Sequence, residues 1–141
     1  MAVRIAVLAS GRGSNLQALL DARTRGALDV EFAGVFSDHA DAAALQRARD
    51  AGVHAQALSP KAHATRAAFD AALFAAVAAV QPQLIVCAGY MRIIDDAVVA
   101  AHTGRMINIH PSLLPRHRGL RTHEGVLAAG EREHGASVHY V

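Results

Sequence analysis

The chain has 141 residues, with 14 Lys and Arg against 12 Asp and Glu, a formal net charge of +2. An apolar share of 52% with so little net charge excludes a disordered chain. The longest apolar run, Ala71 to Val80, covers about half of the roughly 20 residues needed to cross a bilayer. The single cysteine, Cys87, excludes an intramolecular disulfide, and we expect a cytoplasmic protein.

The arginines fall in short groups, such as Arg116, Arg118 and Arg121, and do not form a dense basic stripe. A nucleic-acid-binding surface needs such a stripe, preferably interleaved with aromatic residues. Scattered arginines are typical of solvated faces, and binding of small anions is the next use of this side chain. We therefore expect small-molecule substrates, and neither nucleic acid nor a membrane as a partner.

Strand-like and helix-like stretches alternate from the first residues onward. We predict strands over Val3–Ala9, Val30–Phe36, Val53–Leu58, Leu84–Ala88, Arg105–Ile109 and Ser137–Val141. We predict helices over Leu16–Arg23, Ala40–Ala51, Thr65–Val80, Asp95–His102 and His123–Ala129, with Thr65 as the cap of the third. This alternation is typical of right-handed βαβ units, so it predicts a mostly parallel sheet with helices on both faces. Ligands then bind beyond the carboxyl ends of the strands.

The first strand is followed by the glycine-rich segment Ser10-Gly11-Arg12-Gly13-Ser14-Asn15. Glycine lets backbone N–H groups approach an anion, and the helix that follows, capped by Ser14 or Asn15, favours phosphate at its N-terminus. Leu16 replaces the third glycine of the dinucleotide fingerprint, and no Walker lysine follows. The segment therefore favours a phosphomonoester site. A tight turn without a ligand remains an alternative, and Asp38, after the second strand, keeps a dinucleotide site open.

Asn108 and His110 interrupt the apolar pattern of the fifth strand near its end. Residues two apart share a face of a strand, with Cα atoms about 6.6 Å apart. An amide donor and an imidazole at this spacing can flank one small carbonyl group. Pro111 ends the strand, because proline has no N–H to donate. The alternative is a structural Asn–His pair bonded to neighbouring loops.

Metal binding is not predicted. The spacing of His110, His117 and His123 does not match a helical zinc site, and Cys87 has no second cysteine. Cys87 is interpreted as a small core residue. Near the carboxyl end of the fourth strand, the apolar side chains from residue 91 to 94 can form a wall for a flat ring system, or serve only in packing.

The segments VLASGRGSNLQALLDA, FSDHADAAALQRARDAGV, LIVCAGYMRII, INIHPSLLP and HGASVHYV together resemble the phosphoribosylglycinamide formyltransferases, which are folate-dependent enzymes of purine biosynthesis. The resemblance covers essentially the whole chain. It implies a three-layer α/β/α, Rossmann-like formyltransferase fold with a mostly parallel sheet. It also implies a single formyltransferase domain over residues 1–141, incomplete at its C-terminus.

The resemblance implies transfer of a formyl group from 10-formyltetrahydrofolate, as co-substrate, to the amine of 5-phosphoribosylglycinamide, without a metal, by a monomer or homodimer. In the family, the positions matching Gly13, Ser14 and Asn15 hold the ribose phosphate, and those matching Asn108 and His110 carry out the transfer. The family positions that line the formyl-folate pocket match Arg66, Met91, Arg92, Ile93, Ile94 and Asn108.

The chain departs from the family pattern around residues 115–123, which leaves the roles of Arg116, His117, Arg118 and Arg121 open. The family's catalytic aspartate follows the last strand, in a segment beyond residue 141. We therefore expect the 141-residue form to be inactive.

Three alternatives remain. Methionyl-tRNA formyltransferase and formyltetrahydrofolate deformylase are related enzymes, but they carry further domains for which this chain has no room. The third alternative is a non-catalytic nucleotide-binding module of the same fold.

Overall fold

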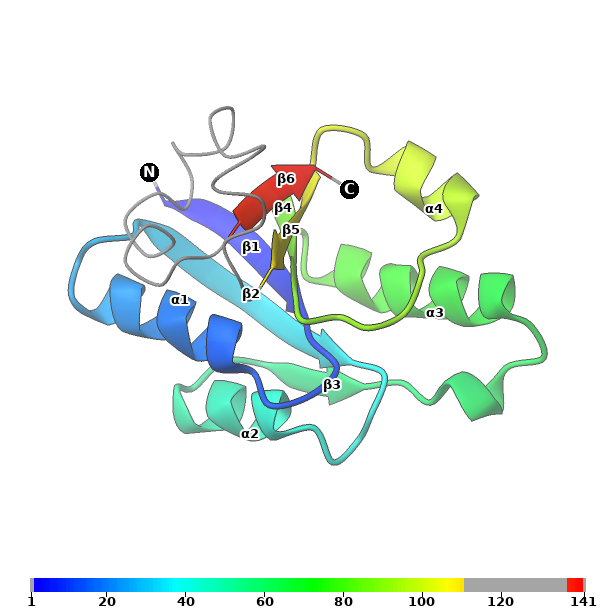
Figure 1. The fold of residues 1–141 in the computed structure, drawn as a ribbon, viewed down its shortest axis with the longest axis horizontal. Coiled ribbons are helices and arrows are strands. Elements are labelled where there is room, and N and C mark those ends of the chain that lie inside the picture. Colours follow the sequence, from blue (N-terminus) through cyan, green and yellow to red (C-terminus); the bar gives the residue numbers. More distant parts are fainter. Residues whose placement is uncertain (1, 111–136, 141) are drawn as a thin grey trace.

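The computed structural model describes residues 2–110 and 137–140, which form one sheet with helices on both of its faces (Figure 1). The strands are β1 (Val3–Leu8), β2 (Val30–Ser37), β3 (Ala55–Ala57), β4 (Leu84–Ala88), β5 (Met106–His110) and β6 (Ser137–Tyr140). The helices are α1 (Ser14–Thr24), α2 (Ala43–Asp50), the 3-10 turn η1 (Pro60–Ala62), α3 (Arg66–Ala79) and α4 (Asp96–Ala101). The helix predicted over 123–129 lies outside the described residues.

The six strands lie in the order β3-β2-β1-β4-β5-β6. All neighbours are parallel except β6, which pairs with β5 in the antiparallel sense. The predicted mostly parallel sheet is confirmed. The chain first builds outward from β1 to β2 and β3, and then returns to place β4 on the other side of β1. The direction of winding therefore reverses between β1 and β4.

Two predicted elements are too long. The strand predicted over 53–58 contains only the three residues of β3, because the N–H of Val53 donates to the carbonyl of Ala48 at the end of α2. The helix predicted from Ala40 begins at Ala43, because the N–H of Ala42 turns back to the carbonyl of His39. In both cases the ends of α2 are closed by local backbone hydrogen bonds that apolar periodicity does not reveal.

The buried side chains form two clusters, one on each face of the sheet. Ile5 and Val7 of β1 face the side covered by α1 and α2, whereas Ala6 and Leu8 face the side covered by α3. This alternation follows from the two-residue period of a strand. A sheet covered on both faces explains why β4, with the sequence LIVCA, is apolar at all its positions and fully buried.

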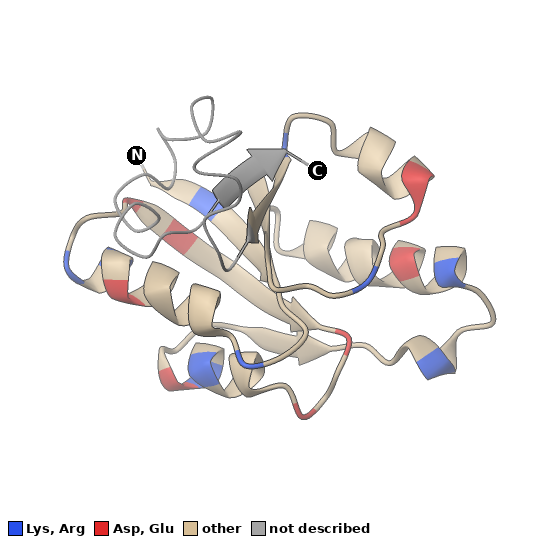
Figure 2. Cartoon of the chain, viewed as in Figure 1, with Lys and Arg blue, Asp and Glu red and all other residues tan. Residues whose placement is uncertain are grey.

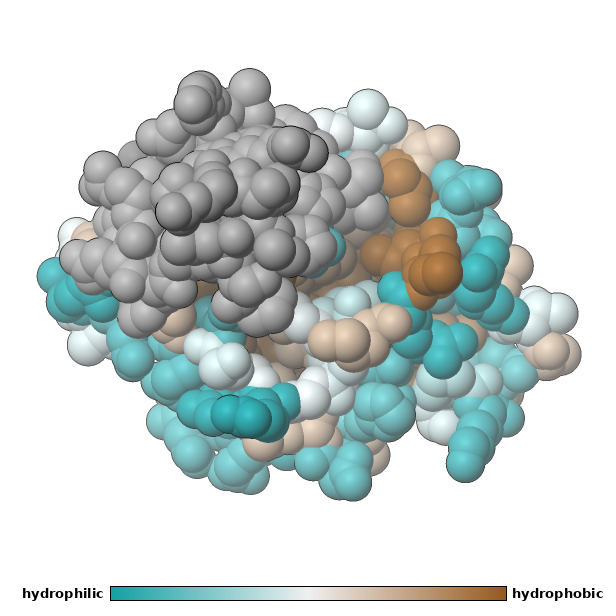
Figure 3. Space-filling model, viewed as in Figure 1, coloured by the Kyte–Doolittle hydropathy of each residue, from teal (hydrophilic) through white to brown (hydrophobic). Residues whose placement is uncertain are grey.

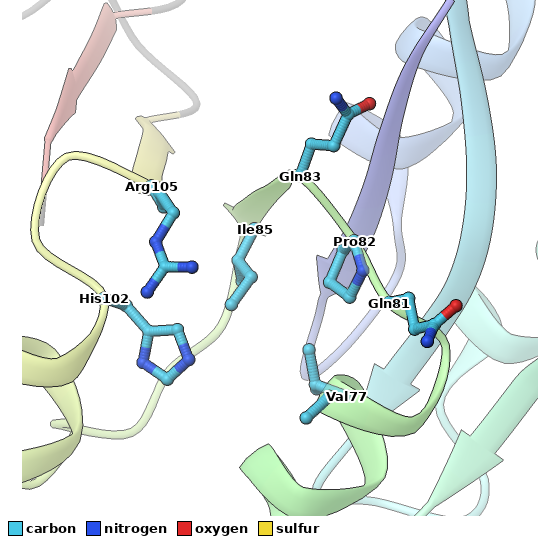
Figure 4. Close-up of a pocket in the computed structure, with 8 residues that line it drawn as sticks. Val77, Gln81, Pro82, Gln83, Ile85, His102 and Arg105 are labelled. Carbon is cyan, nitrogen blue, oxygen red and sulfur yellow. The ribbon is translucent and has the colours of Figure 1, made fainter.

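A cavity of about 220 Å³ lies at the amino ends of β4 and β5 (Figure 4). His102 and Arg105 line one side of it, but both bind the C-terminal turn of α4. The Nδ1 atom of His102 lies 2.8 Å from the carbonyl oxygen of Val98, and Arg105 donates to that of Ala101. These polar groups cap a helix, so this edge of the sheet is not our candidate site.

The described charged residues are dispersed over helices, strand ends and loops (Figure 2). No helix within residues 2–110 is long and apolar enough to cross a membrane.

The first prediction concerns the start of α3, where the predicted cap is confirmed. The side chain of Thr65 accepts a hydrogen bond from the N–H of Ala68, at 3.0 Å. Thr65→Ala should lower the free energy of unfolding by about 1 kcal/mol, and Thr65→Ser should retain most of it, because serine also caps helices. Urea denaturation followed by circular dichroism measures both changes. Equal stability of the alanine and serine variants would contradict the role of the cap.

Candidate functional site

A cavity of about 520 Å³, here called the β1 cavity, lies at the carboxyl ends of β1 and β4. It is lined by Ser10 to Asn15, His39, Ala88, Gly89 and Met91. Its position is the point where the winding of the sheet reverses, and open α/β sheets bind ligands at such a point. The three residues predicted to hold a phosphate, Gly13, Ser14 and Asn15, therefore lie together on one cavity wall.

The glycine-rich segment is held by α2. Gly13 has φ +77°, in the left-handed region, and a Cβ atom at this position would lie 2.7 Å from the Cα atom of Ala44. The N–H of Ala44 donates to the carbonyl of Gly11, and the Nε of Arg47 donates to that of Arg12. The segment thus packs directly on a second helix. This close approach requires glycine at position 13.

The prediction that Ser14 or Asn15 caps α1 is wrong. The capping residue is Gly13, which has no side chain to accept a hydrogen bond from the first turn, and no such acceptor is found among the described residues. Without such a cap, the N–H groups of this turn keep their capacity to donate to an external anion. The positive end of the helix dipole adds to that attraction.

The connection between β4 and α4 separates the β1 cavity from a second one. Its first part is tied to β1, because the N–H of Ser10 donates to Gly89 and the Oγ of Ser10 accepts from the N–H of Met91, at 2.8 Å. Its last part is tied to α3, because the N–H of Asp95 donates to the Oδ2 of Asp70, at 2.7 Å. The connection is therefore anchored at both ends.

The second cavity, here called the β5 cavity, has a volume of about 230 Å³. It is lined by Cys87, Tyr90, Arg92, Ile93, Ile94, Val99 and Asn108. Met91 and Ile93 are the two large apolar side chains that are most exposed among the described residues, at 77% and 75%. Apolar surface gathers beside α4 in Figure 3. An apolar wall with one amide at its edge suits a flat ring that carries a polar substituent.

Asn108 supplies an amide to this wall. It pairs with Cys87 in the register of β4 and β5, and it is half-buried. Its neighbours Ile107 and Ile109 point into the cluster under α1 and α2, so the strand alternation places Asn108 on the α3 side. The backbone of His110 pairs with Ser137, and its side chain lies outside the described part of the structure.

Several buried polar groups lie close to the β5 cavity. Asp70 is fully buried, and its Oδ1 has no hydrogen-bond partner among the described residues; the same holds for the hydroxyl of Tyr90. Burial, followed by the negative charges of Asp38 and Asp70, raises the pKa of Tyr90 above its usual value. Burial also raises the pKa of the Cys87 thiol to about 12. Because only the thiolate is reactive, Cys87 is inert here, as its interpretation as a core residue requires.

Most of the proposed ligand-binding residues line one of the two cavities at the carboxyl ends of the strands. Arg92, Ile93, Ile94 and Asn108 line the β5 cavity, whereas Met91 lies on the β1 cavity, across the connection from its neighbours. Arg66, the first residue of α3, is exposed and lines neither cavity within the described residues.

Ser10 belongs to the predicted glycine-rich segment, but its bond to Met91 and the position of His39 on the cavity wall were not predicted. A signal was present in the sequence, because each residue follows a predicted strand at its carboxyl end, where a ligand is expected. The departures at residues 116–118 and 121 lie outside the described residues.

Comparison with known proteins gives consistent results. The sequence model of the formyl transferase family matches residues 3–141. The chain is 45% identical over 139 residues to a phosphoribosylglycinamide formyltransferase of Escherichia coli (strain K12). This match covers 99% of the present chain and 66% of that protein. The chain is 43% identical over 140 residues to the trifunctional purine biosynthetic protein adenosine-3 of Drosophila melanogaster, covering 98% of this chain and 10% of that protein.

The fold is similar to that of solved formyltransferases. The phosphoribosylglycinamide formyltransferase of Coxiella burnetii matches with a TM-score of 0.82 at 47% identity, over 100% of this chain and 66% of that one. The predicted Rossmann-like formyltransferase fold is therefore confirmed. The chain spans about two thirds of the length of these bacterial proteins.

The second prediction separates the two glycines at the start of the β1 cavity. Gly13→Ala should lower the free energy of unfolding by at least about 2 kcal/mol, from the left-handed backbone and from overpacking against Ala44. Gly11→Ala is the matched control: its Cβ would meet nothing within 4 Å, and its φ lies outside the left-handed region. Its stability should change by less than about 0.5 kcal/mol. Thermal and urea unfolding of both variants test the contrast, which equal stabilities would contradict.

Proposed function

Because the chain belongs to the formyl transferase family, we propose that it transfers the formyl group of 10-formyltetrahydrofolate to the amine of 5-phosphoribosylglycinamide, in purine biosynthesis. The observation that carries this proposal is the pair of cavities on either side of one anchored connection. Met91 lines one cavity and Ile93 the other. Two substrates bound in them would meet at this connection, with Asn108 at the edge of the second cavity.

The β1 cavity supports the binding of a ribose phosphate. Within the described part of the chain, the N–H groups at the start of α1 have no side-chain acceptor, and Gly13 brings the backbone to the cavity wall. A dianionic phosphate at this helix N-terminus gains both hydrogen bonds and a favourable dipole interaction. We assign Gly13, Ser14 and Asn15 to this role.

The β5 cavity supports the binding of the folate ring. Ile93, Ile94 and Val99 offer apolar surface, and Arg92 and Asn108 offer polar groups. The guanidinium of Arg92 lies 5.2 Å from the centre of the Phe69 ring, and its Nε has no partner among the described residues. We assign residues 91–94 and Asn108 to the folate, and Arg66, at the start of α3, to its outer part.

The chemistry follows from charge development in the transfer. The substrate amine attacks the formyl carbon, so negative charge accumulates on the formyl oxygen. Asn108 donates a hydrogen bond to that oxygen, which stabilises the transition state more than the ground state. We assign to His110 a second hydrogen bond to this oxygen and transfer of a proton to the departing folate nitrogen. The folate supplies the activated one-carbon unit, so the proposed reaction needs no metal.

The structure also bears on the alternatives. A dinucleotide site would need the carboxylate of Asp38 for a ribose hydroxyl, but Asp38 is buried and faces His39. A phosphate site at α1 has no evident use in a deformylase, which transfers the formyl group to water. A methionyl-tRNA formyltransferase would use the β1 cavity for the tRNA acceptor end, and this remains the second candidate.

We further propose that the protein acts in the cytoplasm, on small molecules, as a monomer or homodimer.

Binding and transfer assays with three acceptors test this function. We expect saturable binding of 5-phosphoribosylglycinamide and of folate by the 141-residue form. In a protein extended past residue 141 by the segment that the family carries there, we expect formyl transfer only to this ribotide and not to methionyl-tRNA or water. Binding of a dinucleotide instead of the ribotide would contradict the proposal. We expect no transfer by the 141-residue form, and turnover by this form would show that the family's aspartate is not needed.

The third prediction concerns Asn108 and His110, the proposed catalytic pair, in a protein that extends past residue 141 and is active. Asn108→Ala and His110→Ala should each lower kcat strongly, the first by about 10²- to 10³-fold, as expected for loss of one oxyanion donor. The dissociation constant of the folate should change far less. Single-turnover kinetics with a parallel binding titration separate the two effects. Unchanged turnover in both variants would remove these residues from the mechanism.

A further inference from the structure

His39 contributes the imidazole on the wall of the β1 cavity. It follows β2, whose carboxyl end lies beside that of β1. The N–H of His39 donates to the Oγ of Ser37, at 3.1 Å, and its carbonyl accepts from the N–H of Ala42. The backbone of this turn is thus fixed at both of its polar groups, and it presents the ring to the same space as residues 10–15.

The carboxylate of Asp38 lies beside the Nε2 edge of this ring. Its Oδ2 lies 3.5 Å from the Nε2 of His39, and the side chains are 3% and 59% exposed, respectively. The Oδ1 of Asp38 has no hydrogen-bond partner among the described residues. A buried carboxylate requires a compensating partner. The imidazole supplies one at one edge, while the remainder of the ring stays accessible.

Because the carboxylate of Asp38 faces Nε2 of His39, only Nδ1 of this ring is left to bind an anion. A carboxylate facing Nε2 favours the proton on Nε2, so in the neutral ring Nδ1 carries a lone pair and repels a phosphate oxygen. In the imidazolium both nitrogens donate, and Nδ1 can then form a charge-assisted hydrogen bond to an anion. The ring therefore attracts phosphate only when it is protonated.

The other groups around the cavity do not change charge in the same way. The guanidinium groups of Arg12, in the glycine-rich segment, and Arg47, on α2, remain protonated. The pKa of Tyr90 is raised above its usual value, so this phenol stays neutral. Asp38 and Asp41 supply the carboxylates of the turn. Imidazole is the side chain that normally changes charge between pH 5 and 8.

From this geometry we propose that His39, held by Asp38, is a phosphate-binding residue of the β1 cavity, so that the affinity for the ribotide phosphate decreases as the imidazolium loses its proton. The inference rests on the proposed function, because it takes the anion to be the phosphate of the ribotide. It adds a side-chain ligand to the backbone N–H groups of α1, and it assigns Asp38 as a positioning residue.

The experiment measures anion binding by calorimetry at pH 6, 7 and 8. A phosphate ester gains its second charge near pH 6, which would mask the titration of the protein. Inorganic sulfate, which stays divalent over this range, is therefore the first probe, and 5-phosphoribosylglycinamide is the second. The variants are His39→Gln, His39→Lys and Asp38→Asn. His54→Gln is the matched control, because this exposed histidine lies on the approach to β3 and does not line the β1 cavity.

For the unmodified chain and for His54→Gln, the affinity for sulfate should fall about tenfold from pH 6 to pH 8. His39→Gln should bind about tenfold more weakly at pH 6 and show no such fall. His39→Lys should restore the affinity and keep it at pH 8, because an ammonium stays charged. Asp38→Asn keeps the shape of the side chain beside Nε2 but removes its charge, so it should change the ratio of the affinities at pH 6 and pH 8, which a purely structural role would not do. Circular dichroism verifies that each variant is folded.

Equal, pH-independent binding by the unmodified chain and His39→Gln would overturn this inference. If 5-phosphoribosylglycinamide still bound in that case, the proposed function would stand with backbone recognition alone. Failure of the unmodified chain to bind this ribotide at any pH would contradict the proposed function, and this inference with it.

Discussion

The close approach of α1 to α2 at Gly13 is the contact on which the candidate site depends. A Cβ atom at position 13 would lie 2.7 Å from the Cα atom of Ala44. A residue with a side chain would therefore push the segment 10–15 away from α2. That approach sets where the first turn of α1 begins, and therefore where its free N–H groups point. The bonds from Ala44 and Arg47 to the carbonyls of this segment hold it in place. The proposed anion site thus depends on helix packing as much as on the glycine-rich sequence.

The second organising contact is the hydroxyl of Ser10. Through its bond to the N–H of Met91, the segment after β1 is joined to the connection after β4. Asp70 holds the far end of the same connection from α3, on the opposite face of the sheet. A short, anchored wall between two cavities would hold the two proposed substrates at a fixed separation, which is a requirement of direct group transfer. This anchoring of the connection requires the fully buried carboxylate of Asp70. Buried carboxylates are uncommon unless they are well paired.

The two ends of the sheet are chemically different, and this difference assigns the function to one of them. At the amino ends of the strands, His102 and Arg105 bind carbonyl groups at the end of α4. At the carboxyl ends, the start of α1 has N–H donors without a side-chain acceptor in residues 2–110, and the turn after β2 has an accessible imidazole. Parallel strands with helical crossovers produce this asymmetry, because the helix that follows each strand presents its N-terminus at the carboxyl edge.

The alternation of apolar segments by itself determined the element order and the mostly parallel sheet, because the periods of strands and helices differ and both faces of the sheet are buried. The motifs also located the glycine-rich segment and the position of Asn108 at the end of a buried strand. Only the tertiary structure decided that Met91 and Ile93 belong to different cavities, that Gly13 caps α1 in place of Ser14 or Asn15, and that the carboxylate of Asp38 lies beside Nε2 of His39. These are contacts between residues on separate elements, or choices of backbone angle, and local sequence patterns do not encode them.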